Sequence, residues 1–410
     1  MNQIPSPTSS RTTVLVSGGS IAGPAVAYWL NRYGFHVTLV ERNDGTRTGG
    51  QAIDIRAVAI DVVEKMGLLE AIREQRTDMR GASSLDAAGV EISSSSEFTF
   101  SGGVIDNDDV EILRDDLGQI LYEATSDDVE YLFGDSVTEL SETAHGVEVA
   151  FEKNPRRSFD FVIGADGLHS RVRKLAFGPE ADYVHPVNIR EGVTNYAAIF
   201  SVPNYLGLDR WQVARLTDES LTLLYVAKQN TVSRAMLRVL ATDLDYDYRD
   251  KAQQKQIVAD YFAADRQWIM PQLIESMWQA EDFYFDSMSQ TRMDRWSNGR
   301  VALVGDAAFC PSAMSGQGTS VALVGAYVLA GELAAADGEF AAAVENYELE
   351  IRHFVENNQQ LPFLVRNYNV GSAESMDPAA IATQSPHFLD IVNGDPLKDY
   401  STHDRQPASA

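Results

Sequence analysis

A glycine-rich turn near the amino terminus constrains the fold of this chain more than any other feature. TTVLVSG (12–18) is a β-branched run typical of a buried strand, and the turn GGSIAG (18–23) follows it directly. PAVAYWLNRYG (24–34) then carries apolar residues at helical spacing and ends at a glycine, and HVTLVER (36–42) predicts a second strand. A strand–helix–strand unit of this kind is the context in which a G-x-G-x-x-G turn binds the diphosphate of a dinucleotide.

The turn departs from that pattern at its middle position, where Ser20 stands between Gly18 and Gly23. Serine is small, and the unpaired N–H groups and dipole at a helix N-terminus favour an anion, so a diphosphate can still be accommodated. Glu41 ends the second strand at a spacing from Gly18 that suits a hydrogen bond to an adenosine ribose. The alternatives are a small-residue loop before a helix and a solvated charge at a strand end, and the turn alone does not decide between them.

Charge and cysteine content exclude several classes of partner. The 410 residues allow two domains, and 59 acidic against 33 basic side chains give a net charge of −26. Nucleic acids and anionic membranes need basic surfaces, so neither is an expected partner. Cys310 is the only cysteine, which excludes an intramolecular disulfide and indicates a reducing compartment, the cytoplasm. The polar stretch 1–13 does not read as a secretory signal, and 321–336 predicts a buried helix rather than a membrane span.

The rest of the chain alternates between predicted helices and strands. Helical spacing is found in 57–75 (with a break near Gly67), 110–125, 254–263 and 339–367, and strands are predicted in 83–92, 129–152, 184–226 and 281–290. Two further glycine-plus-acid turns follow apolar strands: GADGLHSRVR (164–173) and GDAAFCPSAMSGQG (305–318). Asp-Gly and Gly-Asp pairs are common in ordinary turns, but three such turns at strand ends are unlikely to be coincidental.

With these three turns in this order, residues 14–333 resemble the class A FAD-dependent aromatic monooxygenases, the fold family of para-hydroxybenzoate hydroxylase, and especially its tetracycline-inactivating group. The resemblance implies an α/β fold with a Rossmann-like FAD-binding domain, a β-sheet substrate domain and C-terminal bracing helices. The expected division is 12–80, 103–180 and 283–336 for the FAD-binding domain, 81–102 and 181–282 for the sheet domain, 337–370 for the C-terminal helix, and 371–410 for an irregular tail without catalytic residues, in which HFLDIV (387–392) is a possible ordered patch.

The resemblance also assigns cofactor-binding residues. The first turn would hold the FAD pyrophosphate, with Glu41 on the adenosine ribose and Arg42 near the adenine. Arg114 would contact the phosphate and ribityl side of the flavin, and Asp306 the ribityl chain. The implied set is Gly18, Ser20, Ile21, Ala22, Gly23, Glu41, Arg42, Gly50, Asp54, Arg114, Asp166, Gly167, Gly305, Asp306, Pro311, Gly316 and Gly318.

Residue chemistry supports part of this assignment. Gly316 and Gly318 precede a long helix, so backbone N–H groups can approach a ring and the helix N-terminus can stabilise a developing anion. The alternative is an ordinary glycine-rich helix lead-in. The sequence departs from the family at Ser20 and at Phe309, where a histidine often stands.

The implied reaction is hydroxylation of a flat aromatic or polyketide-like small molecule, with NADH or NADPH and O2 consumed and a C4a-hydroperoxyflavin as oxidant. No side-chain nucleophile and no metal are then needed, and the sequence holds no HExxH or G-x-S-x-G pattern. A flavin-dependent reductase of the same superfamily, without oxygen transfer, and a non-catalytic flavin-binding protein are the alternatives. A halogenase is disfavoured because RQWIMP (266–271) lacks the first tryptophan of W-x-W-x-I-P.

The sequence says less about the residues that contact the substrate than about those that bind the cofactor. An arginine at position 190 inside the sheet would need an anionic or polar partner, and a surface position in a strand is the alternative. For each of the other candidates, ordinary sheet packing competes with substrate contact, and the oligomeric state and the choice between NADH and NADPH stay open. The candidate pocket residues are Arg190, Tyr196, Phe200, Trp211, Tyr225, Met288 and Met314.

Overall fold

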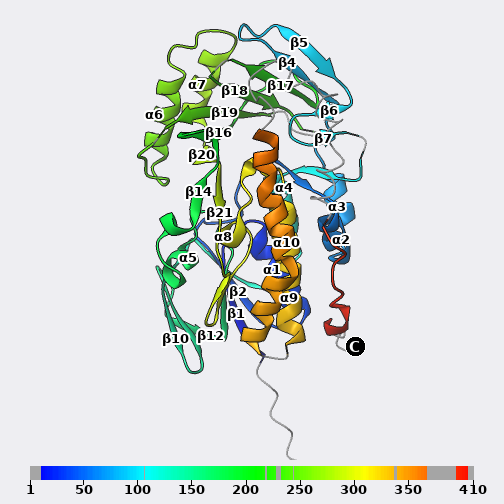
Figure 1. Cartoon of the computed structure of the whole chain (residues 1–410), viewed down its shortest axis with the longest axis vertical. Coiled ribbons are helices and arrows are strands. Elements are labelled where there is room, and N and C mark those ends of the chain that lie inside the picture. Colours follow the sequence, from blue (N-terminus) through cyan, green and yellow to red (C-terminus); the bar gives the residue numbers. More distant parts are fainter. Residues whose placement is uncertain are drawn as a thin grey trace, which may run out of the picture.

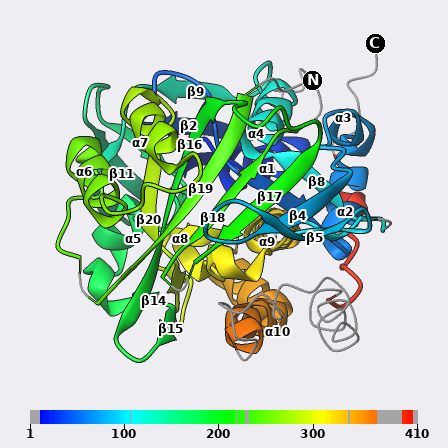
Figure 2. The ribbon, with the colours of Figure 1, turned by 90° about the horizontal axis from the view of Figure 1, so that it is seen from above.

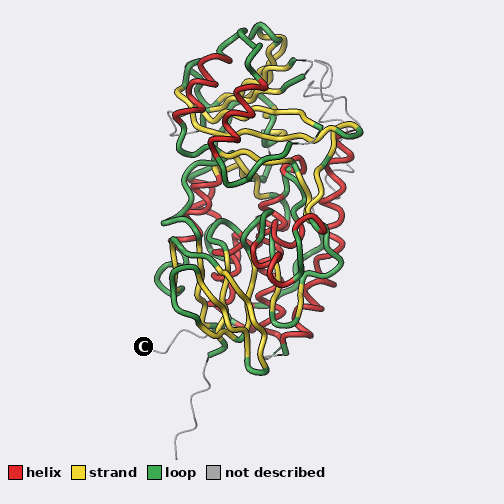
Figure 3. Tube along the Cα trace, turned by 90° about the vertical axis from the view of Figure 1, so that its left-hand side faces the viewer, coloured by secondary structure: helices red, strands yellow, loops and turns green. Residues whose placement is uncertain are grey.

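Two sheets organise the chain, one above the other (Figure 1, Figure 3). The computed structural model describes residues 11–105, 107–217, 219–227, 232–242, 244–336, 339–366 and 394–404, with the backbone alone at 189, 190 and 364–366. The α/β fold expected from the sequence is confirmed.

The first sheet has six strands in the order β22-β23-β13-β1-β2-β9. Five of them run parallel, and β22 pairs antiparallel with β23 at one edge. Their apolar runs suit a sheet that is covered on both faces. The strands are β1 (Thr13–Ser17), β2 (His36–Glu41), β9 (Glu130–Phe133), β13 (Phe161–Gly164), β22 (Ser297–Asn298) and β23 (Val301–Leu303).

This strand order brings the three glycine-plus-acid turns together. The turns follow β1, β13 and β23, which are neighbours in the sheet: Ser17 lies beside Gly164, and Gly164 beside Leu303. The carboxyl ends of parallel strands meet at one edge, which is where ligands bind in open α/β sheets. Segments about 140 residues apart in sequence therefore form one site.

Helices pack against this sheet and one another. In Figure 1, α9 and α10 run side by side in front of it, and α9 also packs on α1. By length and composition α9 could cross a membrane, but 78% of it is buried inside the protein, as a core helix would be. The helices of this half are α1 (Ala22–Arg32), α2 (Val58–Lys65), α3 (Leu69–Glu74), α4 (Arg114–Glu123), α5 (Arg171–Ala176), α8 (Asp306–Phe309), α9 (Gly318–Ala335) and α10 (Phe340–Arg366).

The second sheet has eight strands, seven in the order β15-β16-β19-β18-β17-β4-β5 and an eighth, β20, beside β16 (Figure 2). One face packs against α6 (Lys251–Tyr261) and α7 (Met270–Gln279) in an apolar core. The strands are β4 (Gly81–Leu85), β5 (Glu91–Ser95), β15 (Asn188–Arg190), β16 (Val193–Pro203), β17 (Trp211–Leu216), β18 (Leu221–Tyr225), β19 (Val232–Ala241) and β20 (Tyr284–Ser287).

Short pairs and turns complete the described structure. They are β3 (Ala52–Ile55) with β8 (Val110–Leu113), β6 (Phe98–Thr99) with β7 (Gly103–Val104), β14 (Val184–Pro186) with β21 (Ser289–Thr291), the meander β10 (Val137–Thr143), β11 (Gly146–Phe151) and β12 (Arg157–Phe159), and the 3-10 turns η1 (Glu180–Asp182), η2 (Ala313–Ser315) and η4 (Ser401–His403).

One element differs from the sequence interpretation, and two others bear on the expected division of the chain. The expected helix over 110–125 is a strand, β8, followed by α4, because Val110–Leu113 pairs with β3 and this pairing overrides the helical spacing. Within the region expected to form the C-terminal helix, 337–370, the structure has one helix, α10, with Pro362 inside it. β20 is hydrogen-bonded into the larger sheet although the expected division placed it with 283–336, and the domain boundaries themselves stay a prediction. HFLDIV (387–392) lies outside the described residues.

Candidate functional site

A cavity of about 1570 Å³ lies where the three turns meet the second sheet. Its lining comes from all three turns, from β3 and the 98–104 hairpin, and from one face of β16–β19. Pockets for a single drug-sized molecule usually measure about 300–1,000 Å³. This cavity is large enough for a dinucleotide-sized cofactor and a second small molecule.

Glycines shape the first turn because the backbone approaches itself closely there. Gly18 has φ +113°, and a Cβ on it would lie 2.4 Å from the Ala165 carbonyl oxygen at the start of the second turn. A Cβ on Gly23 would lie 1.8 Å from the Gly18 carbonyl oxygen. Side chains at either position would push the first and second turns apart or open the start of α1.

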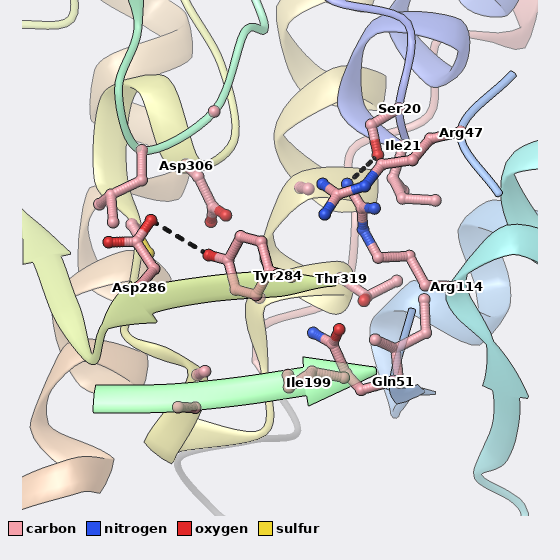
Figure 4. Close-up of a pocket in the computed structure, with 18 of the residues that line it drawn as sticks. Ser20, Ile21, Arg47, Gln51, Arg114, Ile199, Tyr284, Asp286, Asp306 and Thr319 are labelled. Carbon is pink, nitrogen blue, oxygen red and sulfur yellow. Dashed lines mark hydrogen bonds between the residues drawn. The ribbon is translucent and has the colours of Figure 1, made fainter. Parts of the chain in front are cut away.

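Two arginines of the cavity lining lie beside the start of α1 (Figure 4). Arg114 Nη2 donates to Ser20 Oγ at 2.5 Å, and Arg47 lies over the Tyr284 ring at 5.2 Å. Neither guanidinium is within 4 Å of a carboxylate among the described residues. Burial, with the charge of Arg47 adding to it, lowers the pKa of Arg114 to about 10. The N-cap Ile21 makes no side-chain cap hydrogen bond, so no cap side chain occupies the first N–H groups of α1. Free N–H groups at a helix start and two nearby guanidiniums are the groups that suit a bound anion, and we call this candidate the anion site.

Glu41 is fixed at the end of β2 by the first turn. Its Oε2 accepts from the Gly19 N–H at 2.7 Å, and its Oε1 accepts from the backbone N–H and side-chain amide of Asn43. The carboxylate borders the cavity beside Arg42, which is exposed. It lies at the strand end beside the anion site, and its role on an adenosine ribose stays a prediction.

The second turn has a structural task that the sequence did not reveal. Asp166 accepts hydrogen bonds from Ser170 Oγ and from the backbone N–H groups of Arg171 and Val172, so it caps the start of α5. Burial raises the pKa of Asp166, and those hydrogen bonds oppose the shift. Asp166 and Gly167 both border the cavity.

The third turn brings Asp306 and the start of α9 to the cavity. Gly305 has φ +64°, and a Cβ on it would lie 2.9 Å from the Ala22 side chain, so the third turn packs against α1. Burial raises the pKa of Asp306. Pro311, Gly316 and Gly318 line the cavity wall, and the N-cap of α9 has no side-chain cap hydrogen bond.

A buried acidic group stands next to that wall. Arg56 lies 3.0 Å from an Asp54 oxygen and 3.6 Å from Asp109, while Asp54 Oδ1 has no hydrogen-bond partner among the described residues. Burial raises the pKa of Asp54 to about 7, against the opposing charge of Arg56. A carboxyl group that titrates near neutral pH therefore lies inside the cavity.

The second sheet presents alternate residues to the cavity because strand side chains alternate between faces. Tyr225, Met288 and Met314 line the cavity, as expected. Phe200, Trp211 and Tyr196 do not: they lie on the opposite face of the sheet, in or against the core with α6 and α7. The side chain of Arg190 lies outside the described residues, and only its backbone, in β15, is placed.

Three of the implied cofactor residues also lie outside the lining. Gly23, Gly50 and Gly305 shape the backbone behind it, and the Gly50 carbonyl oxygen accepts from Arg234 Nε at 3.1 Å. All the other implied positions border the cavity: Gly18, Ser20, Ile21, Ala22, Glu41, Arg42, Asp54, Arg114, Asp166, Gly167, Asp306, Pro311, Gly316 and Gly318.

Sequence reasoning missed several cavity residues. Arg47 sits in a loop without periodicity, so nothing in the sequence pointed to it. The alternation Arg234, Met236, Arg238 in β19 was a usable signal, since two arginines at even spacing in an apolar strand share one face. The missed cavity residues of the second sheet are Asn195, Ala197, Ile199, Ala214, Leu221, Leu223, Ala235, Met236, Arg238, Tyr284, Asp286 and Ser287.

Comparison with known proteins gives a consistent result. The family model described as "FAD binding domain" matches residues 11–360. An uncharacterized protein of Mycobacterium tuberculosis is 48% identical over 388 residues, 95% of this chain and 100% of its own length. A flavin-dependent monooxygenase of Legionella longbeachae is 37% identical over 86% of this chain and 88% of its own length.

Among solved structures, the tetracycline destructase Tet(51) superposes with a TM-score of 0.85 at 36% identity. The match covers 95% of this chain and all of that one. The likeness therefore extends over both sheets and the cavity between them.

Proposed function

Because the chain belongs to the FAD-binding-domain family that includes the flavin-dependent monooxygenases, we propose that it uses NADH or NADPH and O2 to hydroxylate a flat aromatic or polyketide-like small molecule. Its FAD-dependent monooxygenase character follows from the family and its relatives; the electron donor, the oxygen and the substrate class are the proposal. The reductase alternative is not favoured, because these relatives are named monooxygenases.

The residues around the cavity fit FAD. The uncapped start of α1, Ser20, Arg114 and Arg47 form a cationic site without an anion of its own, which suits a diphosphate. Glu41 would accept from the adenosine ribose, and Gly316 and Gly318 leave room for a ring beside the start of α9. This unpaired positive charge is the observation that carries the proposal.

When bound, FAD supplies the redox chemistry, taking electrons from a reduced nicotinamide and activating O2. The chain would bind and orient FAD and the substrate, and its apolar walls would exclude water from the cavity. N–H groups at the start of α9 would hold negative charge that develops on the ring. Asp54, close to Gly316, can hold a proton on its unpartnered Oδ1 near neutral pH.

The substrate would lie against the second sheet. Leu221, Leu223 and Met236 give that wall an apolar surface, and Phe98 and Phe100 of the hairpin face the same cavity. Such walls exclude water and favour a flat, apolar body. The neighbour named for tetracycline supports a polycyclic substrate.

One experiment tests the whole proposal. The purified FAD-loaded protein is assayed for NADH and NADPH oxidation against phenols and polycyclic polyketides, including tetracycline, under oxygen-18 gas. We expect a substrate-stimulated rate and one labelled oxygen per product molecule. Nicotinamide oxidation that reduces the substrate without label supports the reductase instead, and a protein that cannot take up FAD overturns the cofactor site.

A further inference from the structure

Arg238 is a buried arginine in the wall of the substrate half of the cavity. In β19 it lies opposite Ala197 of β16, on the face that also carries Met236 and Ile199. Figure 4 shows Ile199 on β16 at this wall. Only 6% of the Arg238 side chain surface is exposed.

The guanidinium of Arg238 has no partner in the described residues. Its Nε is buried without a hydrogen-bond acceptor, and no described carboxylate lies within 4 Å of the side chain. Burial lowers its pKa, yet an arginine remains protonated in proteins. Only Nε is fully buried, so the terminal nitrogens face the cavity without an acceptor among the described residues. A charge that is largely removed from water and has no protein partner costs free energy, and a ligand in the cavity could supply the missing acceptors.

Two other buried arginines of the second sheet, Arg234 and Arg215, do have hydrogen-bond partners. Arg234, on the same strand and face, donates to Gly50 O and Ser201 and lies 3.4 Å from Asp115. Arg215, in β17, donates to Asp265 at 2.7 Å and to the Ala87 carbonyl. Arg238 differs from both because its side chain faces the cavity, where no described protein group accepts a hydrogen bond from it.

A second unpartnered polar group lies next to Arg238. Asn195 of β16 pairs with Leu240, which places it diagonally to Arg238 on the same face of the sheet. Asn195 is 6% exposed, its Oδ1 has no partner, and its amide nitrogen reaches only Met314 Sδ, at 3.7 Å. The wall thus offers one cation and one free hydrogen-bond acceptor amid apolar side chains.

We propose that Arg238 and Asn195 recognise an acidic planar substrate: an oxyanion that shares its charge over two oxygens, with a hydroxyl group beside it. The inference rests on the proposed function and names the substrate class of the same cavity. A guanidinium fork matches two coplanar oxygens, as in a carboxylate or an ionised enol. The hydroxyl would donate to Asn195 Oδ1, and Ala197, Leu221 and Met236 would contact the flat body.

Binding to the oxidised FAD-loaded protein, without nicotinamide, tests this directly. The probes are 3-hydroxy-2-naphthoate, its neutral carboxamide, and 2-naphthoate, which lacks the hydroxyl, measured by isothermal titration calorimetry. We expect the hydroxy acid to bind at least 10-fold more tightly than the carboxamide, and Arg238→Met to weaken the hydroxy acid by about 10- to 100-fold and abolish that preference. Asn195→Leu should reduce the preference for the hydroxy acid over 2-naphthoate.

Thermal unfolding without ligand separates substrate recognition from a structural role. Arg238→Met should raise Tm by about 1–3 °C because it removes an unpaired charge that is largely shielded from water. The matched control Arg215→Met should lower Tm, because it leaves Asp265 without its partner. A fall in Tm for Arg238→Met would assign that arginine a structural role and overturn the inference.

The outcomes distinguish this inference from the proposed function. An enzyme that holds FAD and oxidises NAD(P)H, but binds acid and carboxamide equally or binds neither, overturns the substrate class alone. A protein that fails to hold FAD overturns the proposed function, while the calorimetric preference for the acid can still be measured on that protein.

Discussion

At the scale of single residues, Ser20, which stands in place of the middle glycine of the first turn, has a role that the sequence pattern does not show. Sequence reasoning treated Ser20 as a tolerated substitute. In the structure, Ser20 Oγ is the acceptor for Arg114 Nη2, and it is the only hydrogen-bond partner of that guanidinium among the described residues. Ser20 therefore orients a cation at the anion site, which a glycine could not do.

Ser20→Ala should weaken FAD binding by about 10-fold, since a hydrogen bond to a charged group contributes roughly 1.5 kcal/mol at the low end of its range. Ser20→Gly should lose the same contact despite restoring the glycine pattern. Arg114→Met, which removes the charge itself, should weaken binding about 10- to 100-fold. The measurement is quenching of FAD fluorescence on titration with apoprotein. Tighter binding by Ser20→Gly than by the native protein would contradict the orienting role.

At the scale of elements, His169 joins the two halves of the molecule. It lies within the second turn, and its ring nitrogens contact Glu180 of η1 at 2.8 Å and Asp286 of β20 at 2.9 Å. Its ring also stacks on Tyr248, 4.2 Å between centroids. Burial lowers the pKa of His169, but the hydrogen bonds to Asp286 and Glu180 outweigh it and raise the pKa from 6.5 to about 9.

This shift predicts a pH-dependent stability. The folded-state pKa lies above the unfolded value, so the stabilisation by His169 is complete below about pH 6.5 and is lost as the pH rises through about 9. His169→Gln should therefore flatten the fall in Tm between pH 6.5 and 9, measured by differential scanning calorimetry. His145→Gln, at an exposed loop position, is the matched control and should leave the slope unchanged. If His169→Gln leaves the slope of Tm against pH unaltered, then a protonated His169 between Glu180 and Asp286 does not stabilise the protein.

At the scale of the whole molecule, the segment 394–404 packs on helices from distant parts of the chain. Arg32 of α1 pairs with Asp404 at 2.7 Å. Glu332 of α9, only 2% exposed, accepts from Lys398 and from Tyr400 at 2.6 Å. Burial raises the pKa of Glu332, but these hydrogen bonds outweigh it and lower the pKa below its ordinary value.

Removal of residues 394–410 should lower Tm by about 5 °C or more, because it leaves the Glu332 carboxylate buried without its partners. Glu332→Gln should recover part of this loss in the shortened protein, where it removes the unpaired charge. In the full chain the same substitution should destabilise, because it weakens the contacts to Lys398 and Tyr400. An equal Tm for the shortened and full-length proteins would show that the segment contributes nothing to stability.

The sequence by itself determined the fold class and the place of the candidate cofactor site. Both follow from local requirements: glycines where the backbone approaches itself, and acidic residues at the ends of apolar strands. β1, β13 and β23 are adjacent and parallel, so their three turns meet at one edge. Each turn could be recognised locally, and the family resemblance implied a Rossmann-like domain, but the order of the strands comes from the structure.

Only the tertiary structure decided which side chains face the cavity. Alternation in a strand defines two faces, but not which of them is covered by α6 and α7, and so Phe200 and Trp211 were assigned to the wrong face while Met236 and Arg238 were missed. Arg234 and Arg238 are four residues apart in β19, an even spacing that places both on one face of the strand, yet one is paired and the other is not. That difference depends on Gly50 and Asp115, which are distant in sequence and reach Arg234 only when the chain has folded.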